Sequence, residues 1–127
     1  MSLRSLRAQA FQVQHGRCYY CSQPMWQRSP TEVSLPAKLG RWYQCTAEHL
    51  LARQDGGRDT SDNVVAACLL CNLRRHKRAA PAPSPEAYRA LVQRRIAAGR
   101  WRIDFQRTPI SVCISVQSVC NDQFDAT

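Results

Sequence analysis

Four of the seven cysteines stand in two Cys-x-x-Cys pairs, Cys18 with Cys21 and Cys68 with Cys71. Each pair can present two thiolates from one tight turn, and two such pairs can complete a tetrahedral zinc site if the fold brings them together. Protein ligands would fill all four positions, so none is left for an activated water molecule. We therefore expect a structural Zn2+ ion, which also stabilises a small core. The alternative, four free core cysteines, requires both paired spacings to arise by chance.

The number of cysteines and the N-terminal segment favour a reducing cellular compartment. Seven cysteines is an odd number, and the first residues lack the apolar core of a signal peptide, which argues against a disulfide framework. We expect a cytoplasmic protein in which Cys45 is a small core residue, while Cys113 and Cys120 have no assigned partner. No apolar run approaches the length of a membrane span, so we expect no membrane partner.

A second group of residues lies in the stretch 47–78, AEHLLARQDGGRDTSDNVVAACLLCNLRRHKR. This stretch resembles the motif of the HNH, or ββα-metal, endonucleases: an acidic residue and a histidine on a first strand, a Gly-Gly loop, an asparagine before a second strand, then a helix bearing His or Asn. The preceding RCYYC is similar to the zinc-knuckle branch of that family. The resemblance covers residues 17–78 and implies an α+β fold, a ββα-metal core stapled by the four-cysteine site, with flanking helices.

The resemblance also implies a role for each residue of the motif. His49 matches the general base that takes a proton from the attacking water, a role that suits an imidazole. Glu48 matches an acidic metal ligand, and Asn63 matches the residue that fixes the loop and orients His49. Asn72 stands where the family has its last histidine or asparagine, and its side-chain oxygen can bind a hard cation. His76 follows four residues later on the same helix face and could reach the same ion.

One divalent ion is expected from this arrangement, because a histidine rather than a second metal prepares the nucleophile. The ion would offset charge at the scissile phosphate and at the leaving 3′ oxygen. Because Asn72 replaces the usual histidine, the identity of the ion stays open among Mg2+, Mn2+, Ni2+ and Zn2+.

The charge of the chain favours a polyanionic partner. Lys and Arg number 18 against 9 Asp and Glu, a net charge of +9, and residues 1–107 hold all of the basic residues but only 7 of the acidic ones, a net +11. Such a field attracts nucleic acid. Within the motif helix we expect Arg74, Arg75, Lys77 and Arg78 to contact DNA phosphates. The alternative for this run is an ordinary solvated helix face.

Periodicity and breakers predict the elements that must position these groups. The predicted elements are a helix over 3–14 capped by Ser2, a loop over 27–40, a strand over 41–51, a polar loop over 52–63, a strand over 64–67, a helix over 71–77, a stiff linker over 79–85 and a helix over 85–98. We take residues 1–107 as one domain and 108–127 as a tail with strand-like alternation. The aromatic residues expected in the core rather than on a base-stacking surface are Tyr19, Tyr20, Trp26, Trp42 and Tyr43.

The function implied is metal-dependent hydrolysis of phosphodiester bonds in DNA, most simply double-stranded DNA. The alternative is a zinc-stapled nucleic-acid-binding module that has lost catalysis. The Glu48–His49 pair argues against that alternative, because a module that only binds has no need of it. An interaction scaffold without nucleic acid is hard to reconcile with the basic charge of residues 1–107.

Overall fold

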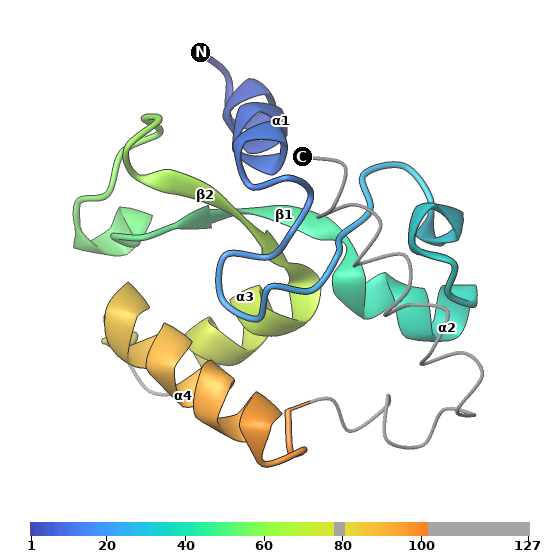
Figure 1. The fold of residues 1–127 in the computed structure, drawn as a ribbon. Helices are drawn as coiled ribbons and strands as arrows, with labels where there is room; N and C mark the ends of the chain where they lie inside the picture. Colours follow the sequence, from blue (N-terminus) through green and yellow to red (C-terminus); the bar gives the residue numbers. More distant parts are fainter. Residues whose placement is uncertain (78–80, 102–127) are drawn as a thin grey trace.

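The computed structural model of the chain describes residues 1–77 and 81–101 (Figure 1). Its centre is an antiparallel pair of strands, β1 (Cys45–His49) and β2 (Val64–Cys68), in which Cys45 pairs with Cys68 and His49 with Val64. The helix α1 (Leu3–Val13) lies against one side of this hairpin, and α3 (Leu69–Lys77), which follows β2 directly, lies on the other. The fold is the predicted α+β arrangement of two strands and a helix. No helix within the described ranges is long and apolar enough to cross a bilayer.

The first helix forms and ends as its sequence predicts. The Ser2 side chain accepts a hydrogen bond from the Ser5 amide at the N-terminus of α1, and Leu6 is buried against the hairpin. Gly16 then adopts a φ of +74°, a conformation that glycine reaches without strain. Between them, the Gln14 side chain accepts from the amide of Ala66 and donates to its carbonyl, as a neighbouring strand would. The end of α1 is thereby attached to the free edge of β2.

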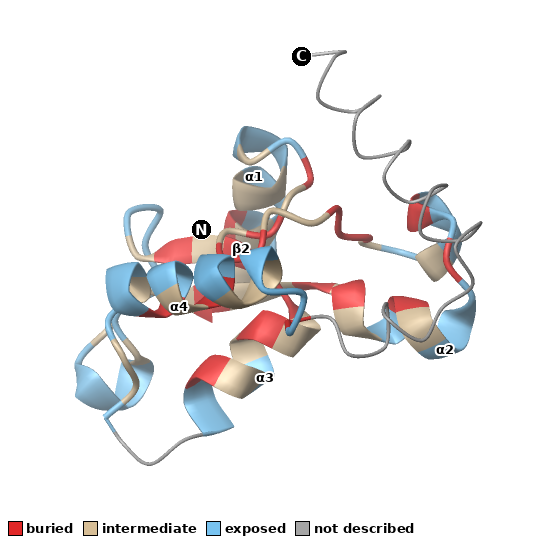
Figure 2. Ribbon diagram, turned by 60° about the horizontal axis from the view of Figure 1, so that its bottom comes forward, coloured by how far each residue is buried: buried red, intermediate tan, exposed pale blue. Residues whose placement is uncertain are grey.

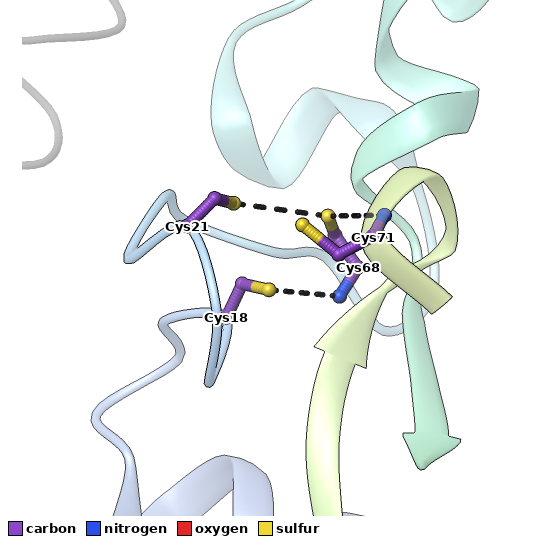
Figure 3. A group of neighbouring side chains, drawn as sticks. All are labelled: Cys18, Cys21, Cys68 and Cys71. Atoms are coloured by element: carbon purple, nitrogen blue, oxygen red, sulfur yellow. Dashed lines mark hydrogen bonds between the residues drawn. The ribbon is translucent and has the colours of Figure 1, made fainter. Parts of the chain in front are cut away.

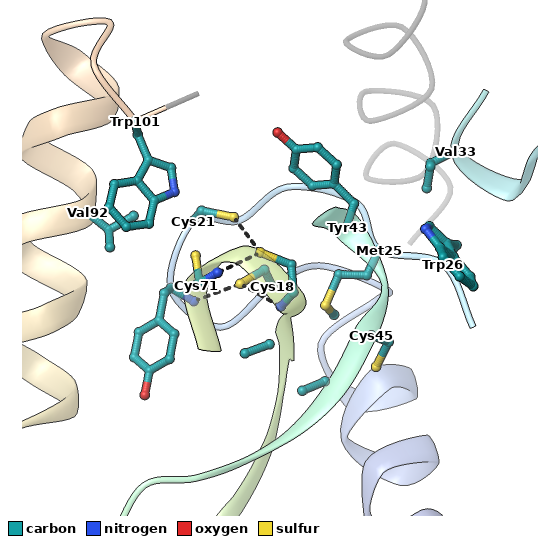
Figure 4. Close-up of a cluster of buried hydrophobic side chains, with 14 of the residues drawn as sticks. Cys18, Cys21, Met25, Trp26, Val33, Tyr43, Cys45, Cys71, Val92 and Trp101 are labelled. Carbon is teal, nitrogen blue, oxygen red and sulfur yellow. Dashed lines mark hydrogen bonds between the residues drawn. The ribbon is translucent and has the colours of Figure 1, made fainter. Parts of the chain in front are cut away.

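The core lies between the hairpin, α3 and α4 (Pro85–Ala97), and the outer side of α4 is exposed (Figure 2). Val92 of α4 and Trp101 pack beside the paired cysteines, and Met25, Trp26 and Val33 extend the same cluster beyond them (Figure 4). The expectation that the aromatic residues pack in the core is confirmed: Tyr20, Trp26 and Tyr43 are buried, and Tyr19 and Trp42 pack against the cluster. Cys45 is buried as well, as expected.

The structure differs from the sequence prediction at the start of β1 and in the predicted loop before it. Residues 41–43 form a 3-10 turn rather than the start of β1, because α3 begins directly after Cys68 and leaves no partner strand for residues before Cys45. The predicted loop 27–40 contains a 3-10 turn, Pro30–Val33, and a short helix, α2 (Ala37–Gly40). The 3-10 turn is stabilised by a capping box, in which Ser29 and Glu32 satisfy each other's backbone amides.

The predicted helices near 71–77 and 85–98 are confirmed within a few residues, and the Ser84 side chain caps α4. Several expectations lie outside the described residues: the first part of the linker, the phosphate contact of Arg78, the partners of Cys113 and Cys120, and the strand in the tail.

Candidate functional site

The two Cys-x-x-Cys pairs meet in the structure. Cys18 and Cys21 lie in the turn after α1, Cys68 ends β2, and Cys71 lies in the first turn of α3 (Figure 3). All four side chains are buried, and their Sγ atoms lie within 4.8 Å of one another. Cys21 Sγ and Cys68 Sγ are 3.8 Å apart. Four sulfurs at the usual Zn–S length of about 2.3 Å would be separated by about 3.8 Å. The cluster therefore fits a tetrahedral metal ion.

The backbone around the cluster donates to its sulfurs. Cys18 Sγ accepts from the amides of Tyr20 and Cys68, and Cys68 Sγ accepts from the amide of Cys71. Burial raises the pKa of Cys68 and of Cys71. Burial also acts on Cys18, but hydrogen bonds from the other three thiols outweigh it and lower the pKa of Cys18 well below its usual value. Four thiolates at this spacing need a cation to offset their repulsion, as a structural zinc ion does.

A second polar group centres on Glu48, which is only 1% exposed. Its side chain is on the face of β1 that packs against α3. Oε2 accepts hydrogen bonds from the Tyr20 hydroxyl at 3.0 Å and from Arg75 Nη1 at 3.1 Å. Oε1 lies 2.9 Å from His76 Nε2. Burial and the Glu48 charge raise the pKa of Tyr20, so its hydroxyl remains a donor to the carboxylate.

The spacing of Glu48 and His76 fits two ligands of one divalent ion. Ligand atoms about 2.1 Å from an octahedral ion, at right angles to each other, lie about 3.0 Å apart. The distance of 2.9 Å between Glu48 Oε1 and His76 Nε2 matches that value, while Tyr20 and Arg75 hold the other carboxylate oxygen. The His76 side chain is 33% exposed, so an ion could approach from solvent on this side.

Asn72, the third predicted metal ligand, is placed differently. Its Nδ2 donates to Thr46 Oγ1 at 3.0 Å and to the Ala47 carbonyl at 3.3 Å. Thr46 precedes Glu48 by two residues and shares its face of β1. Asn72 and His76, one helical turn apart, therefore face successive positions of the same strand. The structure pairs Glu48 with His76 and sets Asn72 beside Thr46.

His49 follows Glu48 and, by strand alternation, points to the opposite face. Its Nε2 lies 2.7 Å from Asp59 Oδ1 in the loop between the strands. Arg53 also binds Asp59, from Nη2 to Oδ2 at 2.7 Å and from Nε to Oδ1 at 3.2 Å. The hydrogen bond from His49 and then the contact with Arg53 lower the pKa of Asp59. Asp59 was not predicted as a site residue, because nothing in the sequence separates it from Asp55 and Asp62 of the same loop.

Asn63 binds the backbone of this loop. Its Oδ1 accepts from the Leu51 amide at 2.8 Å, and its Nδ2 donates to the carbonyls of Leu51 and Arg58, each at 3.0 Å. These contacts are of the kind predicted for Asn63, and they hold the two ends of the loop together. Any effect of Asn63 on His49 acts through the loop, since Asn63 makes no side-chain hydrogen bond to His49 among the described residues.

A family comparison bears on this arrangement. The model of the HNH endonuclease family matches residues 18–78, which include both cysteine pairs, the hairpin and α3. Residues 18–78 belong to the HNH endonuclease family. No curated protein and no solved structure matched the chain. An HNH domain indicates a nuclease or nucleic-acid-binding function.

Within the HNH domain, Arg75 departs from the prediction that it contacts phosphate. It is 3% exposed, and besides Glu48 its guanidinium donates to the carbonyls of His49, Leu50 and Pro83. That prediction is wrong for Arg75, because every guanidinium nitrogen already has a partner inside the molecule. The helix therefore turns Arg75 inward, towards the buried carboxylate.

The neighbours of Arg75 on α3, Arg74 and Lys77, are less buried than Arg75. Arg74 Nη1 donates to the Trp101 carbonyl at 2.9 Å, and its guanidinium lies 4.7 Å from the centre of the Trp101 ring. Lys77 is exposed. Arg74 is half-buried and makes one described hydrogen bond, so the phosphate contacts of Arg74 and Lys77 stay predictions.

The segment after the HNH match also contacts the site. In α4, the Tyr88 hydroxyl donates to the Cys71 carbonyl at 3.0 Å, and Gln93 Nε2 donates to the Tyr20 carbonyl at 2.7 Å. Both contacts end on the turns that hold the paired cysteines. The helix α4 thus closes one side of the HNH domain.

Proposed function

We propose that the chain is a metal-dependent endonuclease that hydrolyses phosphodiester bonds in DNA. In this proposal His49 is the general base, and Glu48 and His76, with Asn72 beside them, hold one divalent ion. The observation that carries the proposal is the 2.9 Å spacing of Glu48 Oε1 and His76 Nε2 in a segment that matches the HNH family. The spacing suits two ligands of one ion, and the adjacent His49 supplies a base on the same strand.

When bound, the divalent ion would supply positive charge at the scissile phosphate and at the leaving 3′ oxygen. The residues of the chain do the rest. Tyr20 and Arg75 hold Glu48 Oε2, so that Oε1 keeps a fixed direction. His49 takes the proton of the attacking water, and the resulting imidazolium lies against the Asp59 carboxylate. Cleavage of this kind leaves a 5′-phosphate and a 3′-hydroxyl.

Double-stranded DNA is the proposed substrate. The net charge of +11 over residues 1–107 supports a polyanion, and Lys77 is exposed at the end of α3. Phosphate contacts of this kind release counterions, so binding should weaken steeply as salt is raised. Arg75 takes no part in this contact, because it is committed to Glu48 and to backbone carbonyls.

A second candidate is a zinc-stapled HNH module that binds nucleic acid without cutting it. The ion pair between Arg75 and Glu48 favours this candidate, because a guanidinium beside the carboxylate offsets part of the charge that would attract a divalent ion. Cleavage measured with added metal separates the two candidates.

The test is a plasmid cleavage assay on protein cleared of loosely held metal, with metal analysis confirming that about one tightly held zinc per chain remains. Mg2+, Mn2+, Ni2+ and Zn2+ are then added in turn. We expect cleavage with at least one of them, and a loss of about 10²–10⁴-fold in rate for His49→Ala with DNA binding retained. Binding without cleavage under every metal would support the second candidate.

His15→Asn is the matched control for His49→Ala. His15 is exposed and has a φ of +56°, a conformation that asparagine also adopts readily. This variant removes a histidine outside the site and should cut DNA at the rate of the unmodified protein. Unchanged cleavage by His49→Ala would contradict the role of His49 as base.

A further inference from the structure

Asp59 is the one carboxylate that contacts His49 among the residues that the structure describes. We propose that Asp59 is a positioning residue for the base: it holds the neutral imidazole of His49 in the tautomer that carries its proton on Nε2. Nδ1 is then the atom that accepts the proton of the attacking water. This proposal rests on the proposed function, in which His49 is the base.

The choice of tautomer follows from the chemistry of the two groups. An ionised carboxylate only accepts hydrogen bonds, and a neutral imidazole has one donor nitrogen and one acceptor nitrogen. His49 Nε2 lies 2.7 Å from Asp59 Oδ1, so in the neutral ring Nε2 must carry the hydrogen. The lone pair is then on Nδ1. Without Asp59, nothing among the described contacts of the His49 ring would favour one tautomer over the other.

The carboxylate of Asp59 is itself fixed. Arg53 binds both of its oxygens through Nη2 and Nε, a two-point contact that sets the plane of the carboxylate as well as its position. The partner of His49 is therefore an oriented acceptor rather than a freely rotating surface side chain. The His49 side chain is 14% exposed, and the Asp59 side chain is 36% exposed.

The backbone of the loop brings Asp59 to His49, although Asp59 lies ten positions later in the chain. Asn63 ties Leu51 to Arg58, the residue before Asp59. Gly57 passes so close to the Leu51 carbonyl that a Cβ there would lie 1.7 Å from the oxygen. The Gly-Gly turn and Asn63 thus fold the loop back on the end of β1, where His49 is.

The first test observes the tautomer directly, by long-range proton–nitrogen NMR spectra of the histidine rings. The missing signals of His49→Gln assign His49 among the three histidines. In the unmodified protein we expect neutral His49 to carry its proton on Nε2. Asp59→Ala should change these nitrogen shifts towards a mixture of the two tautomers, while Asp55→Asn should leave them unchanged. Asp55 is an exposed acid of the same loop whose side chain makes no described contact with His49.

The second test is cleavage under the metal that supports the unmodified enzyme. Asp59→Ala should lower kcat by at least about 10-fold and at most about 10⁴-fold, the upper figure being the loss when a general-base histidine is left in the wrong tautomer. KM should change little, because Asp59 contacts His49 and not the substrate. Asp55→Asn should match the unmodified protein in both constants.

The two tests separate this proposal from the proposed function. A proton on Nδ1 in the unmodified protein, or unchanged nitrogen shifts and kcat in Asp59→Ala, would overturn the positioning role even if the protein cuts DNA. A tautomer that depends on Asp59 in a protein that cuts no DNA under any metal would overturn the catalytic role of the pair, and the proposed function with it. The proposal is supported only if both results are found: a proton on Nε2 of His49 that depends on Asp59, and a loss of kcat in Asp59→Ala.

Discussion

Arg75 illustrates how one side chain can determine the geometry around a buried carboxylate. Its guanidinium donates to Glu48 on β1, to the carbonyls of His49 and Leu50 that follow, and to Pro83 before α4. A buried carboxylate without a partner costs several kcal/mol, so Glu48 depends on this contact. A guanidinium can reach these separate acceptors at once because its donors form a rigid planar fork.

We predict that Arg75→Met destabilises the protein by about 3–5 kcal/mol, because it leaves the Glu48 charge buried with fewer donors. Arg75→Lys should recover only part of the loss, since an ammonium group cannot span the same acceptors. Urea unfolding of the zinc-loaded protein measures both.

The double variant Glu48→Gln with Arg75→Met is the control for the buried charge. It should be more stable than Arg75→Met alone, because no unpaired carboxylate remains. Equal stability of the single and double variants would mean that Arg75 acts through its backbone contacts rather than through Glu48.

At the scale of elements, the conformation of the hairpin loop between β1 and β2 places Asp59 against His49. Gly56 and Gly57 are adjacent in this loop but serve different purposes. Gly56 has a φ of +97° and open space around its Cα, so only its conformation calls for glycine. Gly57 has an ordinary φ but lies directly against the Leu51 carbonyl. The contact between Gly57 and the Leu51 carbonyl therefore limits how closely the loop can approach the end of β1.

We predict that Gly57→Ala moves the loop, because the overlap is with backbone and cannot be relieved by a side-chain rotation. Contact between His49 and Asp59 should be lost or weakened, and cleavage should fall with it. The His49 nitrogen shifts described above measure the contact. Gly56→Asn is the matched control: asparagine tolerates positive φ better than other side chains, and the change should cost about 1–2 kcal/mol while keeping the contact.

At the scale of the whole molecule, the paired cysteines connect segments that lie far apart in the sequence. The turn after α1, the end of β2 and the start of α3 all meet at the four sulfurs. Tyr88 and Gln93 then attach α4 to the same turns. A chain of this size buries a modest core, so a metal ion bound at this junction would have a large share in its stability.

We predict that Cys71→Ser or Cys18→Ser unfolds the domain or nearly does, since structural zinc contributes on the order of 10 kcal/mol in small zinc domains. Strong chelators should have the same effect. Metal analysis should find about one tightly bound zinc per chain. Circular dichroism with thermal melting follows the fold.

Cys45→Ala is the matched control, because Cys45 is equally buried but lies outside the cluster. It removes a thiol without removing a ligand, so the zinc content should not change and the loss of stability should be small. Burial raises the pKa of Cys45 to about 11, so this residue stays a neutral thiol at neutral pH. A domain that stays folded and zinc-free after Cys71→Ser would contradict the role of the cluster.

Local patterns in the sequence were sufficient for much of this fold. The spacing of the cysteines predicts the cluster, Ser2 and Gly16 mark the ends of α1, and the motif of residues 47–78 predicts the hairpin followed by a helix. These features depend on neighbours along the chain: a cap, a breaker or a pair of cysteines three positions apart. The same local reasoning misplaced the start of β1, because strand length depends on the partner strand.

Tertiary structure alone decided which charged groups meet. The sequence presents Arg74, Arg75 and Lys77 as one basic run, yet the direction of α3 against β1 turns Arg75 inward to Glu48 and leaves Lys77 in solvent. The sequence likewise presents several acids in the loop after β1, and only the folding of that loop brings Asp59 to His49. Helix orientation and loop closure are set by packing over the whole core, so no local pattern encodes such pairings.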